Sequence, residues 1–325
     1  MDGNLNSPYN VAMSDFQVEL NAARTGSAWF DQSFRSVIEI SGADAASLID
    51  RISSNDIKNL RNSESLQTGF LNPHAKVLAT AYVLKKKNGL WLETQTDVKE
   101  KLKTYIDKFI FSEDAKIIDR SADLICIGIE GPRSKEMLTQ LAIPVPSENA
   151  FSDSEWNKIS LTVFARSWSL SGGFAIFVPT RLLPSFLSKL KRAPWAGMKT
   201  LNLLRIEKGL PWYGFDMDEN YLLPETGLEE TISYNKGCYT GQEIVARIKS
   251  RGQLKRKLAR LLIQTNSVPA PNAEVKFNDQ TVGHITSAEF DPEKNAVQAL
   301  GYLKVEHIMP SNSLTVSESK AVIQL

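Results

Sequence analysis

The sequence predicts an α+β protein in which two related, ferredoxin-like halves precede a small C-terminal β-barrel. Three observations carry this prediction: a strand-turn-helix pattern that occurs twice, an irregular alternation of strands and helices, and a change of texture near residue 258. The chain has 325 residues, 42% of them apolar, which is enough for more than one hydrophobic core. We expect residues 1–252 to form the paired halves and residues 253–325 to form the barrel.

The twofold pattern consists of a strand, a tight turn and a helix. In the first copy Val37–Ile40 is a predicted strand, and Ser41–Asp44 is an S-x-x-D helix start. The pattern returns 89 residues later, where Ile127–Ile129 is the strand, Gly131 matches the glycine of the first turn, and Pro132 stands at the first helical position. A repeat of this length favours two similar halves over a solenoid. Chance similarity between two turns is the alternative.

Periodicity and turn residues predict the other elements. Alternating or continuous apolar runs predict strands at 77–84, 90–94, 123–129 and 173–178. Helical spacing predicts helices at 96–109, which Thr96 caps, and at 181–192 and 199–208. From residue 258 onward, short strand-like runs alternate with Asn-Asp, Asp-Pro and Ser-Asn turns, which indicates the barrel.

Composition excludes several classes of protein. Lys and Arg number 38 and Asp and Glu 37, so the overall charge favours neither nucleic acid nor an acidic membrane as an obligatory partner. The two cysteines lie far apart, which excludes a disulfide framework and a four-thiolate metal site. The sequence shows no secretory leader, no apolar run long enough to span a membrane and no histidine pair. We therefore expect a cytoplasmic protein without a metal site.

The segment Lys236–Arg247, KGCYTGQEIVAR, is the most informative stretch for chemistry. Thr240 and Glu243 fit a T-x-x-E capping box, which places Cys238 just before a helix N-terminus. Lys236 adds a cation and Gly237 removes steric cover, so we expect a reactive thiolate, with Cys238 and Lys236 as catalytic candidates. A buried structural cysteine is the alternative. We assign that role to the second cysteine, which lies within the apolar run 124–127.

The stretch that follows, residues 247–260, has seven basic side chains in fourteen residues. A solvated helix face is one interpretation. Anion binding is the other, with a multi-carboxylate ligand fitting as well as RNA because no aromatic residues are interleaved.

The motif around Cys238, together with LRIEKGLPWYGFDMDENYLLPE before it and SRGQLKRKLARLLI after it, resembles the YgfZ family of folate-binding proteins. That family is related to the T-protein, the aminomethyltransferase of the glycine cleavage system. Weaker likeness extends to SGADAASLIDRISSNDI, TGFLNPHAKVL, GHITSAEF and ALGYL. The resemblance implies a ring of two α+β domains and a β-barrel, with tetrahydrofolate bound in the central channel.

The resemblance also implies site residues and a role. It gives these candidates for folate binding: Asn55, Phe70, Asn72, Arg205, Glu207, Gln242, Glu243 and Arg247. It implies a role in making or repairing iron–sulfur enzymes, including those that modify tRNA. The expected partners are a reduced folate and iron–sulfur enzymes or cluster-assembly proteins, without a stable nucleic-acid complex and without a membrane.

Two stretches depart from the aminomethyltransferase pattern. The hairpin of those enzymes carries an acidic residue beside the folate, whereas Ala79 and Thr80 stand here. The segment Ser171–Ile176 lacks the Glu that contacts the pterin in those enzymes. We therefore expect an accessory protein rather than a classical enzyme. A tetrahydrofolate-dependent aminomethyl transferase is the first alternative, and an RNA-binding module is the second.

Overall fold

The computed structural model describes residues 15–156, 159–190, 193–252, 254–309 and 312–324. The chain divides into two compact units. The first unit joins the residues up to Ser33 with Asp123–Lys208, and the second joins Phe34–Ala122 with Gly209–Leu325. Each predicted half contributes its own sheet to one unit, and the barrel belongs to the second unit.

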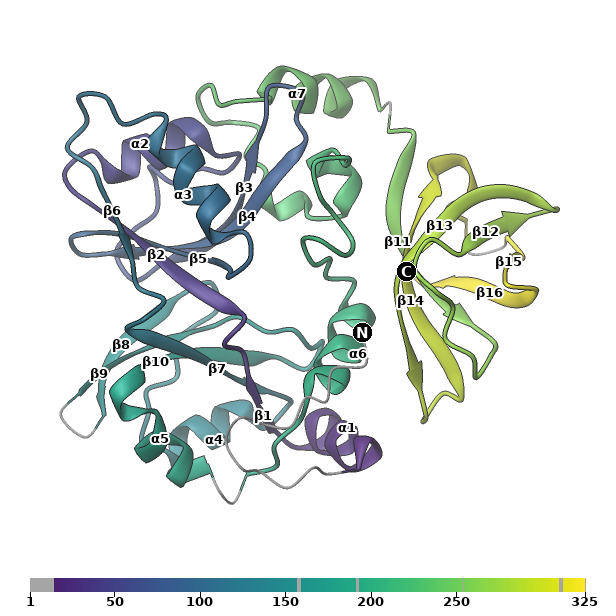
Figure 1. Cartoon of the computed structure of the whole chain (residues 1–325), viewed down its shortest axis with the longest axis horizontal. Coiled ribbons are helices and arrows are strands. Elements are labelled where there is room, and N and C mark those ends of the chain that lie inside the picture. The colour runs from purple at the N-terminus through teal and green to yellow at the C-terminus, as the bar shows by residue number, and fades with distance from the viewer. Residues whose placement is uncertain (1–14, 157–158, 191–192, 253, 310–311, 325) are drawn as a thin grey trace. The chain divides into compact units, whose positions relative to one another are not determined.

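The second unit contains a five-stranded antiparallel sheet of order β3-β4-β5-β2-β6. Its strands are β2 (Arg35–Ser41), β3 (Ser65–Leu71), β4 (Val77–Lys86), β5 (Gly89–Gln95) and β6 (Lys116–Asp119). The helices α2 (Ala45–Ile52) and α3 (Lys99–Asp107) cover one face, and their apolar side chains form a core with those of the strands (Figure 1).

The first unit contains a second five-stranded antiparallel sheet, of order β1-β7-β10-β9-β8. Its strands are β1 (Ala28–Asp31), β7 (Leu124–Glu130), β8 (Phe151–Trp156), β9 (Ile159–Phe164) and β10 (Gly173–Pro179). Its helices are α1 (Phe16–Thr25), α4 (Ser134–Gln140), α5 (Leu183–Leu190) and α6 (Met198–Lys208). Side chains of α4 and α5 complete the core of this sheet.

The two sheets share one topology. In each sheet a three-stranded meander, β3-β4-β5 or β8-β9-β10, adjoins the strand that begins the repeat, β2 or β7. A four-residue strand then closes the edge, and it is β6 in one unit and β1, from the N-terminal part of the chain, in the other. The two sheet-containing halves predicted from the repeat are therefore confirmed.

A glycine with positive φ turns the chain at the same point of each repeat. Gly42 has φ +116° and Gly131 has φ +123°. A Cβ on Gly42 would lie 2.0 Å from the carbonyl oxygen of Asp114, and a Cβ on Gly131 would lie 2.6 Å from that of Gly26. Only glycine combines this conformation with such close backbone approach. Because these turns are longer than predicted, the helices start at residues 45 and 134, and Ser41 and Pro132 precede them.

The C-terminal strands form the closed barrel β11-β14-β13-β12-β15-β16, as predicted. Their bounds are β11 (Arg256–Ile263), β12 (Glu274–Phe277), β13 (Gln280–Asp291), β14 (Ala296–Lys304), β15 (Leu314–Val316) and β16 (Ser319–Gln324). Closure leaves no open sheet edge, and the inward-facing apolar side chains form a separate core.

The segment between the sheet of the second unit and the barrel contains short helices. They are the 3₁₀ turns η2 (Leu223–Thr226) and η3 (Glu229–Thr231) and the helix α7 (Gln242–Arg251). The loop 232–241, which we call the Cys238 loop, connects η3 to α7.

Candidate functional site: an exposed thiol on an anchored loop

Cys238 is solvent-exposed, and the other cysteine is buried. It lies in the Cys238 loop, which backbone and side-chain contacts hold on both sides of the thiol. The alternative interpretation of Cys238 as a buried structural cysteine is therefore wrong. Cys126 is 0% exposed on β7, as predicted, and its Sγ lies 3.8 Å from Gln32 Oε1 and 3.8 Å from Arg166 Nη2.

On its N-terminal side the loop follows the backbone of Ser54 and Asn55. The Ser54 hydroxyl donates to the Thr231 carbonyl at 2.6 Å, and the Ser233 amide donates to the Ser54 carbonyl at 2.9 Å. The Asn55 side-chain amide donates to the Glu230 carbonyl at 2.8 Å. These bonds join segments that lie about 180 residues apart in the sequence, so no local pattern predicts them.

Lys236 ends in a cage of backbone carbonyls. Its Nζ donates to the carbonyl oxygens of Asp50, Ser53 at 3.0 Å and Asn55 at 2.7 Å, and the Asp50 carboxylate lies 3.3 Å away. The side chain is only 2% exposed. Burial lowers the pKa of this ammonium, and the Asp50 carboxylate opposes that shift. The three N–H donors therefore point to the backbone, and the role of Lys236 as a cation acting on the thiol stays a prediction.

On its C-terminal side the loop is held by three successive residues. Tyr239 is buried in an apolar cluster, and the Thr240 side chain interacts with the Tyr105 hydroxyl, lowering a pKa that burial raises. Gly241 has φ +83°, and a Cβ there would lie 2.9 Å from the Asn72 carbonyl oxygen. A side chain at 241 would push the loop off the turn between β3 and β4.

The predicted capping box does not form. The N-cap of α7 is Gly241, without a side-chain cap, because its left-handed conformation moves the helix start one residue past Thr240. Glu243 instead pairs with Arg247 at 2.6 Å, one turn along the helix. The cap predicted for Thr96 is also absent, since α3 begins at Lys99 and the Thr96 hydroxyl bonds the Ser36 hydroxyl at 2.7 Å.

The two asparagines predicted for folate support the backbone around the loop. The Asn55 amide also donates to the Gln67 carbonyl at 2.8 Å, and its oxygen accepts from the Asp56 amide at 2.9 Å. The Asn72 oxygen accepts from the backbone amides of His74 and Lys76 and so holds the turn that packs on Gly241. Asn55 thus uses both ends of its side-chain amide internally, and its assignment to the ligand stays a prediction.

Three other predicted folate residues have internal partners. Phe70 is 0% exposed and packs edge-on against Tyr105, so its ring offers no surface on which a pterin could stack. Arg205 is 1% exposed and donates to the Asn202 side chain at 2.8 Å. Glu207 accepts from Arg24 at 2.6 Å. Phe70 is therefore a core residue, and the other two belong to the first unit, whereas the remaining candidates belong to the second.

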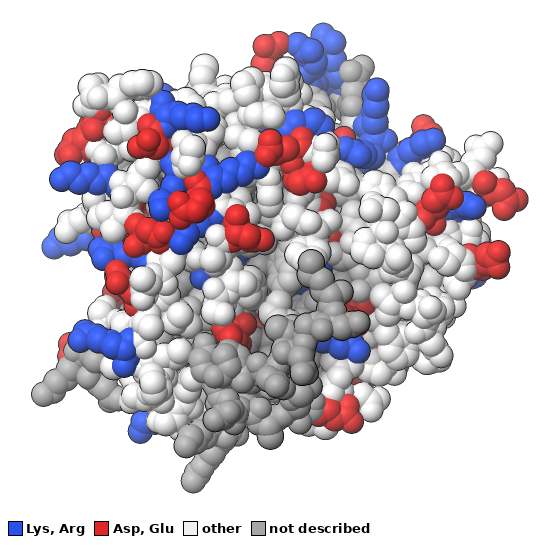
Figure 2. Space-filling model, in the orientation of Figure 1, with Lys and Arg blue, Asp and Glu red and all other residues white. Residues whose placement is uncertain are grey.

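The basic segment is largely paired within the second unit. Arg256 donates to the Asn220 carbonyl at 2.9 Å, Lys257 pairs with Glu229 at 2.7 Å, and the Lys249 ammonium lies 4.4 Å from the centre of the Tyr234 ring. Basic side chains lie along the upper edge of the view in Figure 2, where α7 lies in Figure 1. These pairs support the interpretation of a structured, solvated face, and Gln242 lies at the start of that helix.

Several buried carboxylates were not identified from the sequence, among them Glu93 and Glu130. Glu93 is 0% exposed and binds the Arg35 guanidinium through both oxygens, at 2.6 and 2.7 Å. Glu130 accepts from the Ser167 hydroxyl at 2.6 Å and the Trp168 amide at 3.1 Å, and burial raises its pKa. The sequence signal that could have identified Glu93 is a charged residue in the middle of strand β5.

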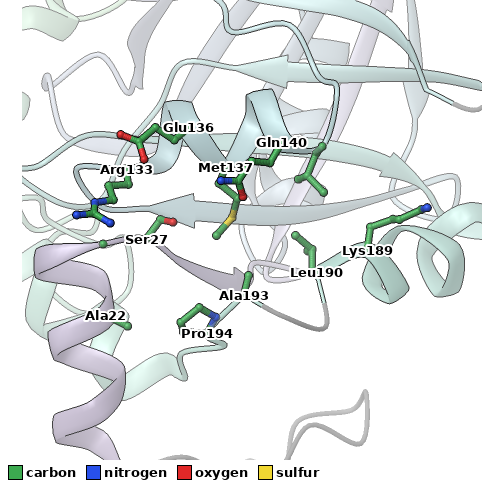
Figure 3. Close-up of a pocket in the computed structure, with 12 residues that line it drawn as sticks. Ala22, Ser27, Arg133, Glu136, Met137, Gln140, Lys189, Leu190, Ala193 and Pro194 are labelled. Atoms are coloured by element: carbon green, nitrogen blue, oxygen red, sulfur yellow. The ribbon is translucent and has the colours of Figure 1, made fainter.

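A groove with a volume of about 500 Å³ lies in the first unit. Figure 3 shows Met137 near its centre and the side chains of Arg133 and Glu136 at one rim. None of the residues predicted for folate lines this groove. We assign no ligand to it.

The described residues offer neither a metal site nor a membrane span. Within the part of the chain that the structure describes, no three His, Cys, Asp or Glu side chains are grouped closely enough to bind a metal ion. Among the described helices none has the length and apolar character needed to cross a bilayer.

Comparison with known proteins places these features in a family. The model of the GCVT N-terminal domain matches residues 7–236. The aminomethyltransferase of Alkaliphilus oremlandii is 25% identical over 304 residues, which cover 90% of this chain and 82% of that protein. A chloroplastic putative transferase of Arabidopsis thaliana is 25% identical over 308 residues, which cover 92% and 70% of the two chains.

A solved structure has the same fold. The glycine cleavage system aminomethyltransferase T from Bartonella henselae superposes with a TM-score of 0.85, covering 94% of this chain and 87% of that one. The sequence identity is 19%, so the likeness concerns the fold. That fold has two sheet-containing halves and a closed six-stranded barrel, as described above.

Proposed function

The chain belongs to the GCVT N-terminal domain family, and from this premise we propose that it binds a reduced folate and acts through Cys238. In this proposal it is an accessory protein for the assembly or repair of iron–sulfur enzymes, and it supports tRNA modification indirectly, as in the YgfZ branch. The observation that carries the proposal is the exposed thiol on a loop anchored from both sides. A thiol that is exposed and yet held in place is suited to repeated reaction with a partner, whereas a structural cysteine would be buried in the core.

The residues at 79 and 80 support an accessory role over aminomethyl transfer. Ala79 is fully buried in β4, and the Thr80 carbonyl accepts the Thr94 hydroxyl at 2.9 Å. Neither side chain exchanges a proton at neutral pH. A positioned acid or base contributes about 100- to 10,000-fold to reactions that move a proton, so its loss removes most of the transferase rate.

A tetrahydrofolate-dependent aminomethyl transferase is the second candidate. The names of the relatives favour it, because the bacterial protein is an aminomethyltransferase and the plant protein a putative transferase. These names support transfer more directly than they support the iron–sulfur role. The two candidates share folate binding and differ in the group that reacts.

Folate contacts are proposed for predicted residues whose side chains are half-buried or exposed. We retain Asn72 and Gln242 for the ring, and Arg247 for the glutamate tail, since the pair between Arg247 and Glu243 is exposed and easily exchanged. Titration calorimetry with mono- and polyglutamylated tetrahydrofolate tests this. We expect tighter binding of the polyglutamate and loss of that difference in Arg247→Ala. The absence of heat with both ligands would remove folate from the proposal.

The role of the thiol is tested in a host strain that lacks this protein. We expect the strain to lose activity of several iron–sulfur enzymes and tRNA thiolation, and the normal protein to restore both. Cys238→Ser is nearly isosteric but replaces the thiol by a hydroxyl that does not ionise at neutral pH, and we expect no restoration. Full restoration by that variant contradicts the proposal. Formation of methylene-tetrahydrofolate from an aminomethylated lipoyl carrier, well above the uncatalysed rate, would establish the second candidate instead.

A further inference from the structure

The turn at the end of α2 forms a cation cage, and we propose that the ammonium of Lys236 is its tethered occupant, which fixes the position of the Cys238 thiol. The cage consists of the carbonyl oxygens of Asp50, Ser53 and Asn55, with the Asp50 carboxylate at 3.3 Å from Nζ. Lys236 is then a positioning residue for the loop. Its role for Cys238 in function rests on the proposed function, whereas the cage itself does not.

The end of a helix supplies this cage with its charge. Asp50 and Ser53 belong to the last turn and the C-cap of α2, where carbonyl groups lack helical partners. These carbonyls carry the negative end of the helix dipole, which favours a cation. The Asp50 carboxylate is itself held in place, because it accepts from the backbone amides of Ile57 at 2.9 Å and Lys58 at 3.1 Å.

The stoichiometry of donors and acceptors is complete. An ammonium has three N–H donors, and three carbonyl oxygens receive them. Burying a charge without such partners is strongly unfavourable, so an amine that is 2% exposed stays in this position only while the cage is intact. The cage and the loop therefore stabilise each other.

Lys236 is the anchor nearest to the thiol on its N-terminal side. The other bonds on that side end at Ser233, five residues before Cys238. Gly237 does not pack against other residues, since a Cβ there would meet no atom within 4 Å. Without the ammonium, the nearest contacts on the two sides of the thiol would be that of Lys249 with the Tyr234 ring and the buried Tyr239.

Lys236→Ala tests the proposal, because it removes three carbons and the amine and leaves a space that propylammonium fills. We expect hydrogen exchange of the amides 233–238 to accelerate by about 10- to 100-fold, as loss of bonds to a charged group implies. The alkylation rate of Cys238 should change in the same variant. Millimolar propylammonium should restore both, and tetramethylammonium, which has no N–H donor, should restore neither at equal ionic strength.

Two further variants separate positioning from a general loss of stability. Lys208→Ala removes a lysine that donates to the Ser167 carbonyl at 2.7 Å in the other unit, and we expect no effect on the Cys238 loop. Lys236→Arg keeps the charge but places a planar guanidinium in a cage shaped for a point charge, and we expect partial loosening.

Three results would overturn the proposal. They are unchanged exchange in Lys236→Ala, equal effects of propylammonium and tetramethylammonium, and global unfolding of Lys236→Ala that propylammonium does not reverse. The proposed function fails separately, if Lys236→Ala loosens the loop and Cys238→Ser still restores the host strain.

Discussion

Replacing each of the two cysteines by alanine tests the site, because we expect one substitution to lower the stability of the protein and the other to leave it nearly unchanged. Cys126 is 0% exposed on β7, where its sulfur contacts the Gln32 and Arg166 side chains. Removing the sulfur forfeits the transfer free energy of one buried heavy group, about 0.8 kcal/mol. A residual cavity of about 25 to 30 Å³ adds roughly 0.6 kcal/mol at about 24 cal/mol per Å³.

We therefore expect Cys126→Ala to lower the free energy of unfolding by about 1.5 kcal/mol. Cys238→Ala removes an exposed sulfur and should change it by less than about 0.5 kcal/mol. Denaturant unfolding followed by circular dichroism gives both values. Alkylation of the native protein by iodoacetamide, followed by mass spectrometry, should modify Cys238 and leave Cys126 protected until the first unit opens.

Two outcomes contradict this reasoning. One is a loss of stability in Cys238→Ala as large as that in Cys126→Ala, since it would show a packing role for the exposed thiol. The other is equal alkylation of the two thiols in the native protein, since it would show that β7 is accessible.

Three other predictions concern the fold outside the site. Gly42→Ala and Gly131→Ala should each lower the free energy of unfolding by at least about 1 to 2 kcal/mol because of the positive φ alone. The loss should be larger for Gly42→Ala, because its Cβ would lie 2.0 Å from a carbonyl oxygen. A measurable loss in only one variant would contradict the equivalence of the two turns. Glu93→Gln should lower the free energy of unfolding by about 3 to 5 kcal/mol, because it removes the carboxylate that binds the buried Arg35 guanidinium, and replacing both residues with apolar ones should lower it less. Hydrogen bonds, first from the Phe111 amide and then from Arg51, lower the pKa of Glu113 from 4.5 to about 2. Since this pKa is lower in the folded state, the ionised Glu113 contributes stability above pH 4.5, and this contribution is lost as the pH falls towards 2. The stability of Glu113→Gln should therefore fall less over this pH range than that of the unchanged protein.

The fold was predictable because its strongest signals are local. Gly42 and Gly131 mark the same turn, and each stands between an apolar strand and a helix with one apolar face. The barrel was predictable because its turns carry Asn-Asp and Asp-Pro pairs, whereas the serine of the predicted Ser-Asn turn lies outside the described residues. Helix starts were less predictable, since a capping box and a left-handed glycine compete at Thr240 and Gly241, and the packing of Gly241 on the turn at Asn72 favours the glycine.

The environment of the site was not predictable because long-range contacts build it. The sequence identifies Lys236 as a cation near a thiol, but its acceptors lie on the turn 50–55. Phe70 was assigned to a ligand because its motif aligns with a folate-binding family, and only the packing of α3 over β3 shows that its ring is internal. Asn55 joins two segments far apart in the chain, which no spacing rule reveals.

The residues next to Cys238 in the motif have structural roles, and these limit the role that remains for Cys238. Lys236 occupies the cage, Tyr239 is buried, Thr240 interacts with the Tyr105 side chain, and Gly241 packs on a turn. Each of these residues has a structural reason for its identity. Cys238 projects into solvent and so has no comparable packing role among the described residues. A loop built to hold a chain in this shape would be equally stable with serine or alanine at that position, so a requirement for cysteine there would have to come from the chemistry of sulfur.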